Sequence, residues 1–327
     1  MKFLGSLLLL VLAAALLAGY ILYAPYGPST ETFVDIPTGT GTPAIASQMQ
    51  QTGIIRSRYG FELLRLIKGG TLHAGEYRFD HPAPLTQVYA SIARGDTYTL
   101  GLTIPEGYNI FDIAQAVQSA GLGSASDFLA AEHQHTELIA QWSPHATSLE
   151  GYLFPATYRF SRHTTPEQML TAMVHRFRQA AIHLGLGDHA ADTVITASLI
   201  EKEVSQDTER PLVAGVFVNR IALGMPLETD PAVIYAALLD GRYRGTIYLS
   251  DLQSLSPYNT YKHPGLPPGP ICNPGLAALQ AALHPARTDY LYFVSDAAGH
   301  TRFSVDLKQH QQQVAAYREA ERARSNR

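Results

Sequence analysis

Two glutamates are the side chains best suited to acid–base chemistry, and both lie in residues 191–210, ADTVITASLIEKEVSQDTER. If this segment is helical, Ile195, Leu199 and Glu203 fall at positions i, i+4 and i+8, so Glu203 projects from an apolar stripe. Glu201 lies about 200° round the same helix, where we expect its carboxylate to be solvated. Desolvation raises the pKa of a carboxyl and retains its proton near neutrality. Glu203 is therefore a candidate general acid for a glycosidic oxygen.

A structural explanation of Glu203 stays open beside the catalytic one. A glutamate on an apolar helix face is frequently the partner of a buried arginine, because an isolated buried carboxylate is costly. Arg210 or Arg220 would be that partner here. The pattern alone does not choose between the two interpretations.

Three turn-rich segments after this helix could contact a sugar. Residues 227–231, LETDP, form a turn into a helix, where Asp230 is expected as the N-cap before a proline at the first helical position. Residues 256–261, SPYNTY, and 265–270, GLPPGP, supply aromatic rings, amides and a rigid backbone. Such groups suit the apolar faces and hydroxyls of sugars, and they suit a proline-rich packing loop equally well.

Other chemistries find little support in the sequence. The chain has 13 histidines but no His-Glu-x-x-His motif, and it has neither a Gly-x-Ser-x-Gly nor a Walker-type loop. We therefore expect no metal and no cofactor. The single cysteine, Cys272, excludes a disulfide framework and is expected to be a small buried residue. With a net charge of −4 and no basic tract, the chain gives no reason to expect nucleic acid as a partner.

The N-terminal segment predicts where this chemistry takes place. No charged residue lies between Lys2 and Glu31, which explains part of the low charged fraction of 16%. Residues 3–24 would form a helix of about 33 Å, enough to cross the ~30 Å hydrocarbon core of a bilayer. Lys2 precedes this helix and the next cation is Arg56, so the positive-inside rule puts residues 25–327 outside the cytoplasm. A cleaved signal peptide is the alternative, although its apolar run is usually only ~7–15 residues long.

The sequence predicts that the candidate site residues are held by an α+β fold with an internal repeat. By composition and periodicity we expect strands over 34–36, 98–104 and 291–295, and helices over 192–204, 210–222, 231–239 and 275–283. A set of short patterns recurs after 68 residues: Pro37-x-Gly39, Ile45-Ala46 and Gly53-Ile54 against Pro105-x-Gly107, Ile113-Ala114 and Gly121-Leu122. This recurrence indicates a duplicated strand–helix module.

We expect six parts along the chain. They are a cytoplasmic N-terminus with a transmembrane anchor at 1–24, a linker at 25–31, a small α/β module at 32–99, a LysM-like module at 100–145, a mixed α/β catalytic domain at 146–320 and a polar tail at 321–327.

Taken together, the motifs of the chain resemble the MltG (YceG-like) endolytic murein transglycosylases. They are LEGYLFPATY (149–158), ASLIEKE (197–203), VFVNR (216–220), LETDPAVIY (227–235), YNTY (258–261), GLPPGPI (265–271), HPA (284–286), YLYFV (290–294) and HTRFS (300–304). The resemblance covers nearly the whole chain and is densest over 149–310. The chain departs from the family pattern at Val204, where threonine is common, and at Ala156, where aspartate is common.

The resemblance implies a bacterial enzyme with a single span in the cytoplasmic (inner) membrane and its catalytic domain on the outer side. Such an enzyme cleaves MurNAc-β-1,4-GlcNAc bonds in nascent peptidoglycan glycan strands and leaves 1,6-anhydro-MurNAc ends. The catalytic residue that it implies is the second glutamate of Glu-Lys-Glu, Glu203. Peptidoglycan strands, and synthases of the wall, are the implied partners. Further site candidates are Tyr258, Asn259 and Thr260 as groove contacts, and Asn219, Arg220, Glu228 and Asp230 around them.

Two other functions stay open at this point. A hydrolytic muramidase would use Glu203 together with a second carboxylate, either Glu209 or Asp230. A non-catalytic glycan-binding scaffold would recruit wall synthases and would need no catalytic carboxyl.

Overall fold

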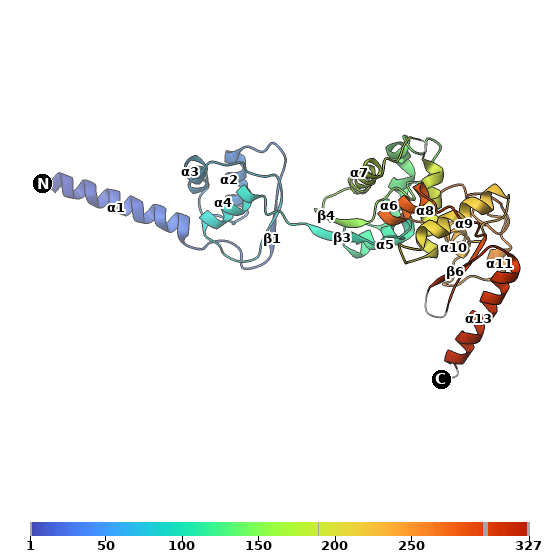
Figure 1. Ribbon diagram of the computed structural model, residues 1–327. Helices are drawn as coiled ribbons and strands as arrows, with labels where there is room; N and C mark the ends of the chain where they lie inside the picture. Colours follow the sequence, from blue (N-terminus) through green and yellow to red (C-terminus); the bar gives the residue numbers. More distant parts are fainter. Residues whose placement is uncertain (1, 189, 297–299, 326–327) are drawn as a thin grey trace. The chain divides into compact units, whose positions relative to one another are not determined.

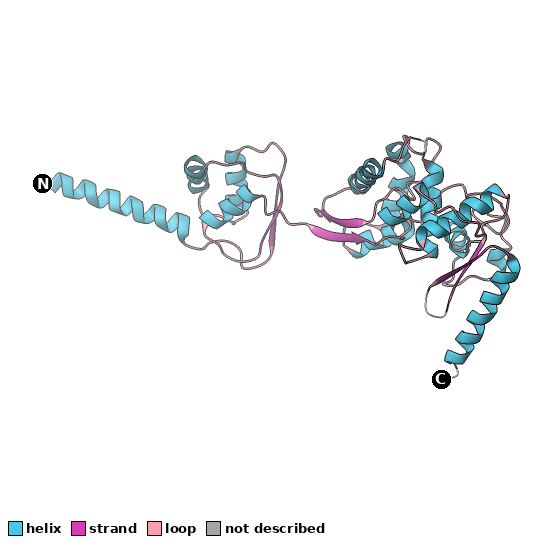
Figure 2. Cartoon of the chain, in the orientation of Figure 1, coloured by secondary structure: helices cyan, strands magenta, loops and turns pink. Residues whose placement is uncertain are grey.

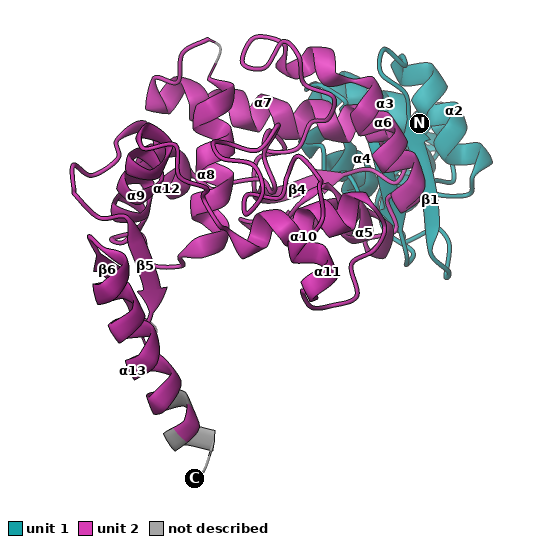
Figure 3. Ribbon diagram, turned by 90° about the vertical axis from the view of Figure 1, so that its right-hand side faces the viewer, with its two compact units in different colours: residues 1–100 teal, residues 101–327 magenta. Residues whose placement is uncertain are grey.

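The computed structural model describes residues 2–188, 190–296 and 300–325 (Figure 1). Most of the described chain is helical, and its strands are short (Figure 2). The chain divides into two compact units, residues 1–100 and residues 101–327, which are described separately (Figure 3). Met1 and the last two residues of the predicted tail at 321–327 lie outside the described residues.

Unit 1 places helices against one antiparallel strand pair. Its elements are α1 (Lys2–Tyr23), β1 (Thr32–Ile36), α2 (Thr42–Gln51), α3 (Arg58–Lys68), β2 (Gly75–Phe79) and α4 (Leu85–Arg94). β1 pairs with β2 in a register that sets Val34 opposite Tyr77, so both side chains enter the core.

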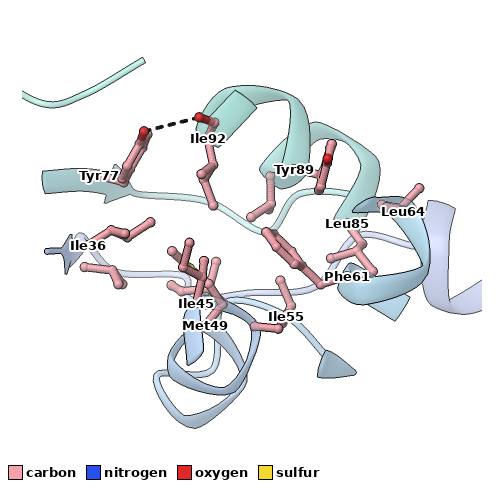
Figure 4. Packing of buried hydrophobic residues seen from close by; sticks show 14 of the residues in the cluster. Ile36, Ile45, Met49, Ile55, Phe61, Leu64, Tyr77, Leu85, Tyr89 and Ile92 are labelled. Carbon is pink, nitrogen blue, oxygen red and sulfur yellow. Dashed lines mark hydrogen bonds between the residues drawn. The ribbon is translucent and has the colours of Figure 1, made fainter. Parts of the chain in front are cut away.

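The core of unit 1 is a cluster of buried apolar side chains from all five of the elements after α1 (Figure 4). Ile36, Met49, Phe61 and Ile92 are each at most 2% exposed. Tyr77 brings a hydroxyl into this cluster, and it donates to the carbonyl of His73 at 2.8 Å. The polar group of Tyr77 is therefore satisfied within an apolar core.

α1 projects from the core of unit 1. Residues Gly5–Tyr23 have a mean hydropathy of 2.4 and are long and apolar enough to cross a membrane, and none of that window is buried against protein. A signal sequence near an N-terminus has the same character. Helix length and composition thus agree with the predicted anchor without excluding the signal peptide.

Unit 2 consists of helices with two strand pairs. Its elements are β3 (Leu100–Ile104), α5 (Ile110–Ser119), α6 (Ala125–Gln134), the 3-10 helix η1 (Thr136–Ile139), β4 (Ala156–Phe160), α7 (Pro166–Leu184), α8 (Ala191–Glu203), α9 (Arg210–Ala222), α10 (Asp230–Leu239), α11 (Leu249–Leu252), α12 (Leu276–Leu283), β5 (Tyr292–Ser295), β6 (Thr301–Ser304) and α13 (Leu307–Ser325). β3 pairs with β4, and β5 is antiparallel to β6. The mixed α/β class agrees with the prediction, and the four predicted helices match α8, α9, α10 and α12 to within a residue.

The 68-residue repeat is visible in the secondary structure. β1 and α2 recur as β3 and α5, with every boundary shifted by 68 residues. The second copy belongs to unit 2, where its strand pairs with β4. The segments predicted as a LysM-like module and a catalytic domain therefore share a strand pair and lie in one unit.

α8 is the central helix of unit 2. It packs against α9, α10 and α12, and Leu199 and Ile200 are fully buried. Neighbours surround the middle of α8, so the helix meets open space mainly at its two ends. Glu203 is the last residue of its C-terminal end.

Candidate active site

A cavity of about 280 Å³ opens at the C-terminal end of α8. Six separate segments of the chain form its wall. The lining residues are Glu203, Arg220, Leu227, Glu228, Asp230, Tyr261, Tyr292, Phe293 and His310. Four of the residues predicted from the sequence thus meet in one place.

Glu203 lies at this cavity without a hydrogen-bond or ion-pair partner among the described residues. Burial raises the pKa of its carboxyl to about 7, and the nearby charge of Asp230 acts in the same direction. The partial negative charge at the C-terminus of α8 also disfavours the carboxylate. The desolvation expected from the helical pattern is present, and Glu203 holds its proton up to near-neutral pH.

The prediction that Glu201 is solvated is wrong. Its carboxylate accepts from Arg210 Nη2 at 3.1 Å and from the backbone N–H of Gly275 at 2.9 Å, and its side chain is 6% exposed. α12 and the start of α9 cover the Glu201 face of α8. This helix is therefore buried on its polar face as well as on its apolar stripe. The buried arginine that could have explained Glu203 belongs to Glu201 instead.

Asp230 does not cap α10, contrary to the prediction. The N-cap is Thr229, whose hydroxyl meets Thr260 at 3.1 Å and makes no cap bond, and Asp230 begins the helix itself. The Asp230 carboxylate instead accepts a hydrogen bond from the Tyr261 hydroxyl at 2.7 Å. Asp230 is thereby held as a second carboxylate on the wall of the Glu203 cavity.

Arg220 fixes the turn before α10. Its guanidinium donates to the carbonyls of Leu291 at 2.7 Å and Pro226 at 2.8 Å, and it pairs with Glu228 at 3.1 Å. Glu228 has φ of +58°, the one positive φ outside glycine among the described residues. A residue with a Cβ in this left-handed region is strained, and such strain is characteristic of functional sites.

Tyr292 and His310 form an aromatic part of the cavity wall. The guanidinium of Arg220 lies 5.0 Å from the ring centroid of Tyr292. The imidazole of His310 stacks on the same tyrosine ring, with 5.2 Å between the two ring centroids. Nδ1 of His310 is buried and has no hydrogen-bond partner in the described chain. Burial and the charge of Arg220 lower the pKa of His310, so its imidazole is neutral near pH 7.

A second cavity of about 730 Å³ lies at the other ends of α8 and α10. Tyr258 lines this cavity, together with Pro267, Pro268, Ile195 and Leu239. Tyr258 and Glu203 therefore lie at different cavities of the same unit. Asp230 and Leu239 are nine residues apart on α10, which corresponds to about 14 Å of helix.

Three predicted contact residues have their side chains engaged by the protein. Asn259 is fully buried and donates to the carbonyl of Ser254 at 2.7 Å, and Thr260 bonds the N–H of Thr229 at 3.0 Å. Asn219 donates to the carbonyl of Thr288 at 2.7 Å. In this structure all three hold loops in place rather than face the Glu203 cavity.

Sequence reasoning did not single out Tyr261, Tyr292 or His310. Tyr261 and Tyr292 lie in two of the motifs that resemble the family, and those motifs could have indicated them as site residues. His310 lies in no recognisable pattern. Within the part of the chain that the structure describes, no group of three or more His, Cys, Asp or Glu side chains is placed to hold a metal ion.

Comparison with known proteins identifies relatives over almost the whole chain. The model of the YceG-like family matches residues 34–316. An endolytic murein transglycosylase of Bacillus subtilis (strain 168) is 34% identical over 94% of this chain and 91% of its own length. A protein of the same name from Streptococcus pneumoniae (strain D39) is 31% identical over 87% of this chain, which spans 58% of that longer relative.

A solved structure has a similar fold. The crystal structure of a yceG-like protein from Listeria monocytogenes is 30% identical and superposes with a TM-score of 0.56. The match covers 87% of this chain and 99% of the other.

Proposed function

The chain belongs to the YceG-like family, and from this premise we propose that it is a peptidoglycan lytic transglycosylase. It cleaves MurNAc-β-1,4-GlcNAc bonds within nascent glycan strands and leaves 1,6-anhydro-MurNAc ends. The names of its relatives support murein as the substrate, because the relatives from Bacillus subtilis and Streptococcus pneumoniae are named endolytic murein transglycosylases.

One observation carries the assignment of chemistry to Glu203. Its carboxyl is partnerless, lies at a cavity, and has a pKa raised to about 7. A general acid is most effective when its pKa lies near the working pH. The alternative of a structural arginine pair is unsupported, since Arg210 pairs with Glu201 and Arg220 with Glu228.

The proposed reaction uses Glu203 twice. Protonated Glu203 gives its proton to the glycosidic oxygen while the bond from that oxygen to C1 of MurNAc breaks and positive charge develops at C1. The C6 hydroxyl oxygen of the same MurNAc bonds to C1, and the Glu203 carboxylate takes the hydroxyl proton. Glu203 ends protonated and no water is consumed. Holding the C6 oxygen near C1 favours ring closure over attack by water.

The other groups at the cavity support this step. Asp230, held by Tyr261, keeps the pKa of Glu203 high and offers negative charge near the developing oxocarbenium ion. Arg220 fixes the strained turn that carries Glu228. The unpartnered Nδ1 of His310 supplies a hydrogen-bonding site for a sugar hydroxyl or acetamido group.

A glycan strand is longer than the Glu203 cavity, and we assign Tyr258 to its more distant part. The ring of Tyr258 and the neighbouring prolines form an apolar wall of the second cavity, which suits the flat face of a sugar. α10 and the loop of residues 256–261 run from this cavity to the first. Asn259 and Thr260 hold the loop that runs between the two cavities, and Asn219 holds the segment of Thr288.

A hydrolytic muramidase is the second candidate, because Asp230 stands at the same cavity as Glu203. Glu209, the other carboxylate considered, is occupied by the backbone N–H of Thr301 at 3.0 Å and its hydroxyl at 2.5 Å. Mass spectrometry of digested peptidoglycan separates the two reactions. A transglycosylase produces anhydro ends, each lighter by one water than the reducing ends that a hydrolase produces. Reducing ends as the main product would overturn the proposal.

We further propose that α1 remains uncleaved as a single span in the cytoplasmic membrane, with both units on the outer side. The apolar length of α1 and the position of Lys2 support this topology. Strands emerging from wall synthases at that surface would be the substrate nearest to the enzyme. We include in this proposal that residues 100–145 form a LysM-like module.

A further inference from the structure

α3 in unit 1 has an apolar stripe that the protein core does not use. Its core face consists of Gly60, Phe61 and Leu64, which are buried. On a different face stand Tyr59, Leu63, Leu66 and Ile67, with 66, 43, 83 and 67% of their surfaces exposed. Four large apolar side chains at i, i+4, i+7 and i+8 form one continuous strip along a helix. Such a strip in contact with water is unfavourable.

The charges on α3 border this exposed stripe. At 100° per residue the stripe occupies about 100° of the helix circumference, with the core face on one side of it. Arg58, Glu62 and Arg65 fall on the other side, and Lys68 ends the helix. This arrangement of core, apolar and cationic faces is that of a helix lying in the plane of a membrane surface.

Unit 1 carries its own indication of where a membrane would be. The last turn of α1 packs against α3 and α4, and a Cβ on Gly60 of α3 would come within 2.9 Å of Ile21. In Figure 1, α3 lies on the side of unit 1 from which α1 leaves, and it runs across the direction of α1. A helix that crosses the axis of a spanning helix at its outer end lies along the bilayer surface.

The residues between α1 and α3 have the chemistry of a membrane interface. The guanidinium of Arg56 lies 4.4 Å from the ring centroid of Tyr20 and 5.0 Å from that of Tyr26. Tyrosine and arginine are favoured at the level of the lipid headgroups. This cluster joins the end of α1 to the start of α3.

We propose that α3 is an interfacial helix, whose stripe of Tyr59, Leu63, Leu66 and Ile67 lies in the outer leaflet of the membrane that α1 spans. Arg58, Arg65 and Lys68 then face anionic headgroups. The inference rests on the proposed anchoring by α1. Its consequence is that unit 1 is seated on the membrane at two places instead of being tethered by α1 alone.

Site-specific quenching tests this placement in the full chain. Single cysteines replace Leu66 on the stripe, Leu12 in α1 and Asp35, which is exposed on β1. An environment-sensitive thiol dye reports each site in vesicles of phosphatidylcholine and phosphatidylglycerol that carry a nitroxide-labelled lipid. The native Cys272 is fully buried and its thiol has a raised pKa, so the dye reacts with the introduced residue.

We expect quenching and a blue shift of emission at positions 12 and 66, and neither at position 35. If position 12 is quenched but position 66, like position 35, is not, the interfacial placement of α3 is overturned and the anchoring by α1 still stands. Absence of quenching at 12 would overturn the anchoring, and the inference with it. In the Arg58→Glu/Arg65→Glu background, quenching at 66 should fall in anionic vesicles and stay unchanged in purely neutral ones. Equal quenching in both lipids would contradict the role given to the cations.

Discussion

Glu203 owes its raised pKa to its surroundings, and the same surroundings make a prediction about stability. Its folded-state pKa of about 7 lies above the ordinary value of 4.5. The stabilising contribution of the protonated carboxyl is therefore complete below pH 4.5 and is lost as the pH rises through 7. Glu203→Gln removes that loss, so the variant should be more stable than the wild type by up to ~3 kcal/mol at about pH 8.5.

Urea unfolding of the full chain in detergent at about pH 4 and pH 8.5 measures this difference. The two proteins should unfold at similar urea concentrations at the lower pH. A variant that is no more stable than wild type at the higher pH would show that the carboxyl is not desolvated.

The hydroxyl of Tyr261 is expected to matter through Asp230. Tyr261→Phe removes the donor of the 2.7 Å hydrogen bond and releases the Asp230 carboxylate. A loss of about 1 kcal/mol in transition-state stabilisation should lower kcat/KM for glycan cleavage roughly five- to tenfold. Tyr243→Phe, at an exposed tyrosine outside the cavity, is the matched control and should leave cleavage unchanged. Equal activity of the two variants would remove Tyr261 from the site.

At the scale of elements, the segment before β4 packs closely against the proline-rich loop of residues 265–270 at Gly151. Gly151 has φ of +89°, and a Cβ there would lie 2.5 Å from Cγ of Pro270. Gly151→Ala combines backbone strain with a clash against a rigid ring, so it should destabilise unit 2 by at least ~2 kcal/mol. Gly187→Ala is the control, since a Cβ there meets no atom within 4 Å. Similar unfolding midpoints for both alanine variants would refute this explanation.

The elements themselves follow from local sequence to a large extent. Periodic apolar residues and proline near the helix starts specify α9 and α10, and the repeated Pro-x-Gly pattern marks the equivalence of β1 with β3. Local pattern failed where a long-range neighbour decided the outcome. Glu201 is buried because Arg210 and the backbone of Gly275 reach it, and Thr260 takes the hydroxyl of Thr229 away from capping α10.

Helix geometry selected Glu203, whereas Arg220, Glu228 and Asp230 were candidates because they lie in or beside recognisable motifs. Glu203 could be selected because the stripe that exposes it lies within its own helix. His310 could not, because it comes more than a hundred residues later and reaches the cavity through the packing of α13 against the β5–β6 pair. A cavity that is formed by segments far apart in the sequence depends on tertiary packing, which local sequence patterns do not reveal.

For the whole molecule, the topology proposed from α1 can be measured directly. An intact mass of the purified full chain should include residues 2–24, because no signal peptidase removes them. An alkaline phosphatase fused after Arg327 should be active in a bacterial host, since that enzyme functions only outside the cytoplasm. A mature mass lacking α1 would identify a signal peptide, and an inactive but intact fusion would reverse the topology.

If Glu203 cuts glycan strands by proton transfer without water, a single digest of peptidoglycan should reveal it. Purified peptidoglycan strands are treated with the wild type, with Glu203→Gln and with Asp207→Asn, whose carboxylate is exposed four residues further along the chain. We predict anhydro-MurNAc ends from the wild type and from Asp207→Asn, and no cleavage by a folded Glu203→Gln that still binds the strands. Undiminished formation of anhydro ends by Glu203→Gln would exclude Glu203 as the catalytic acid.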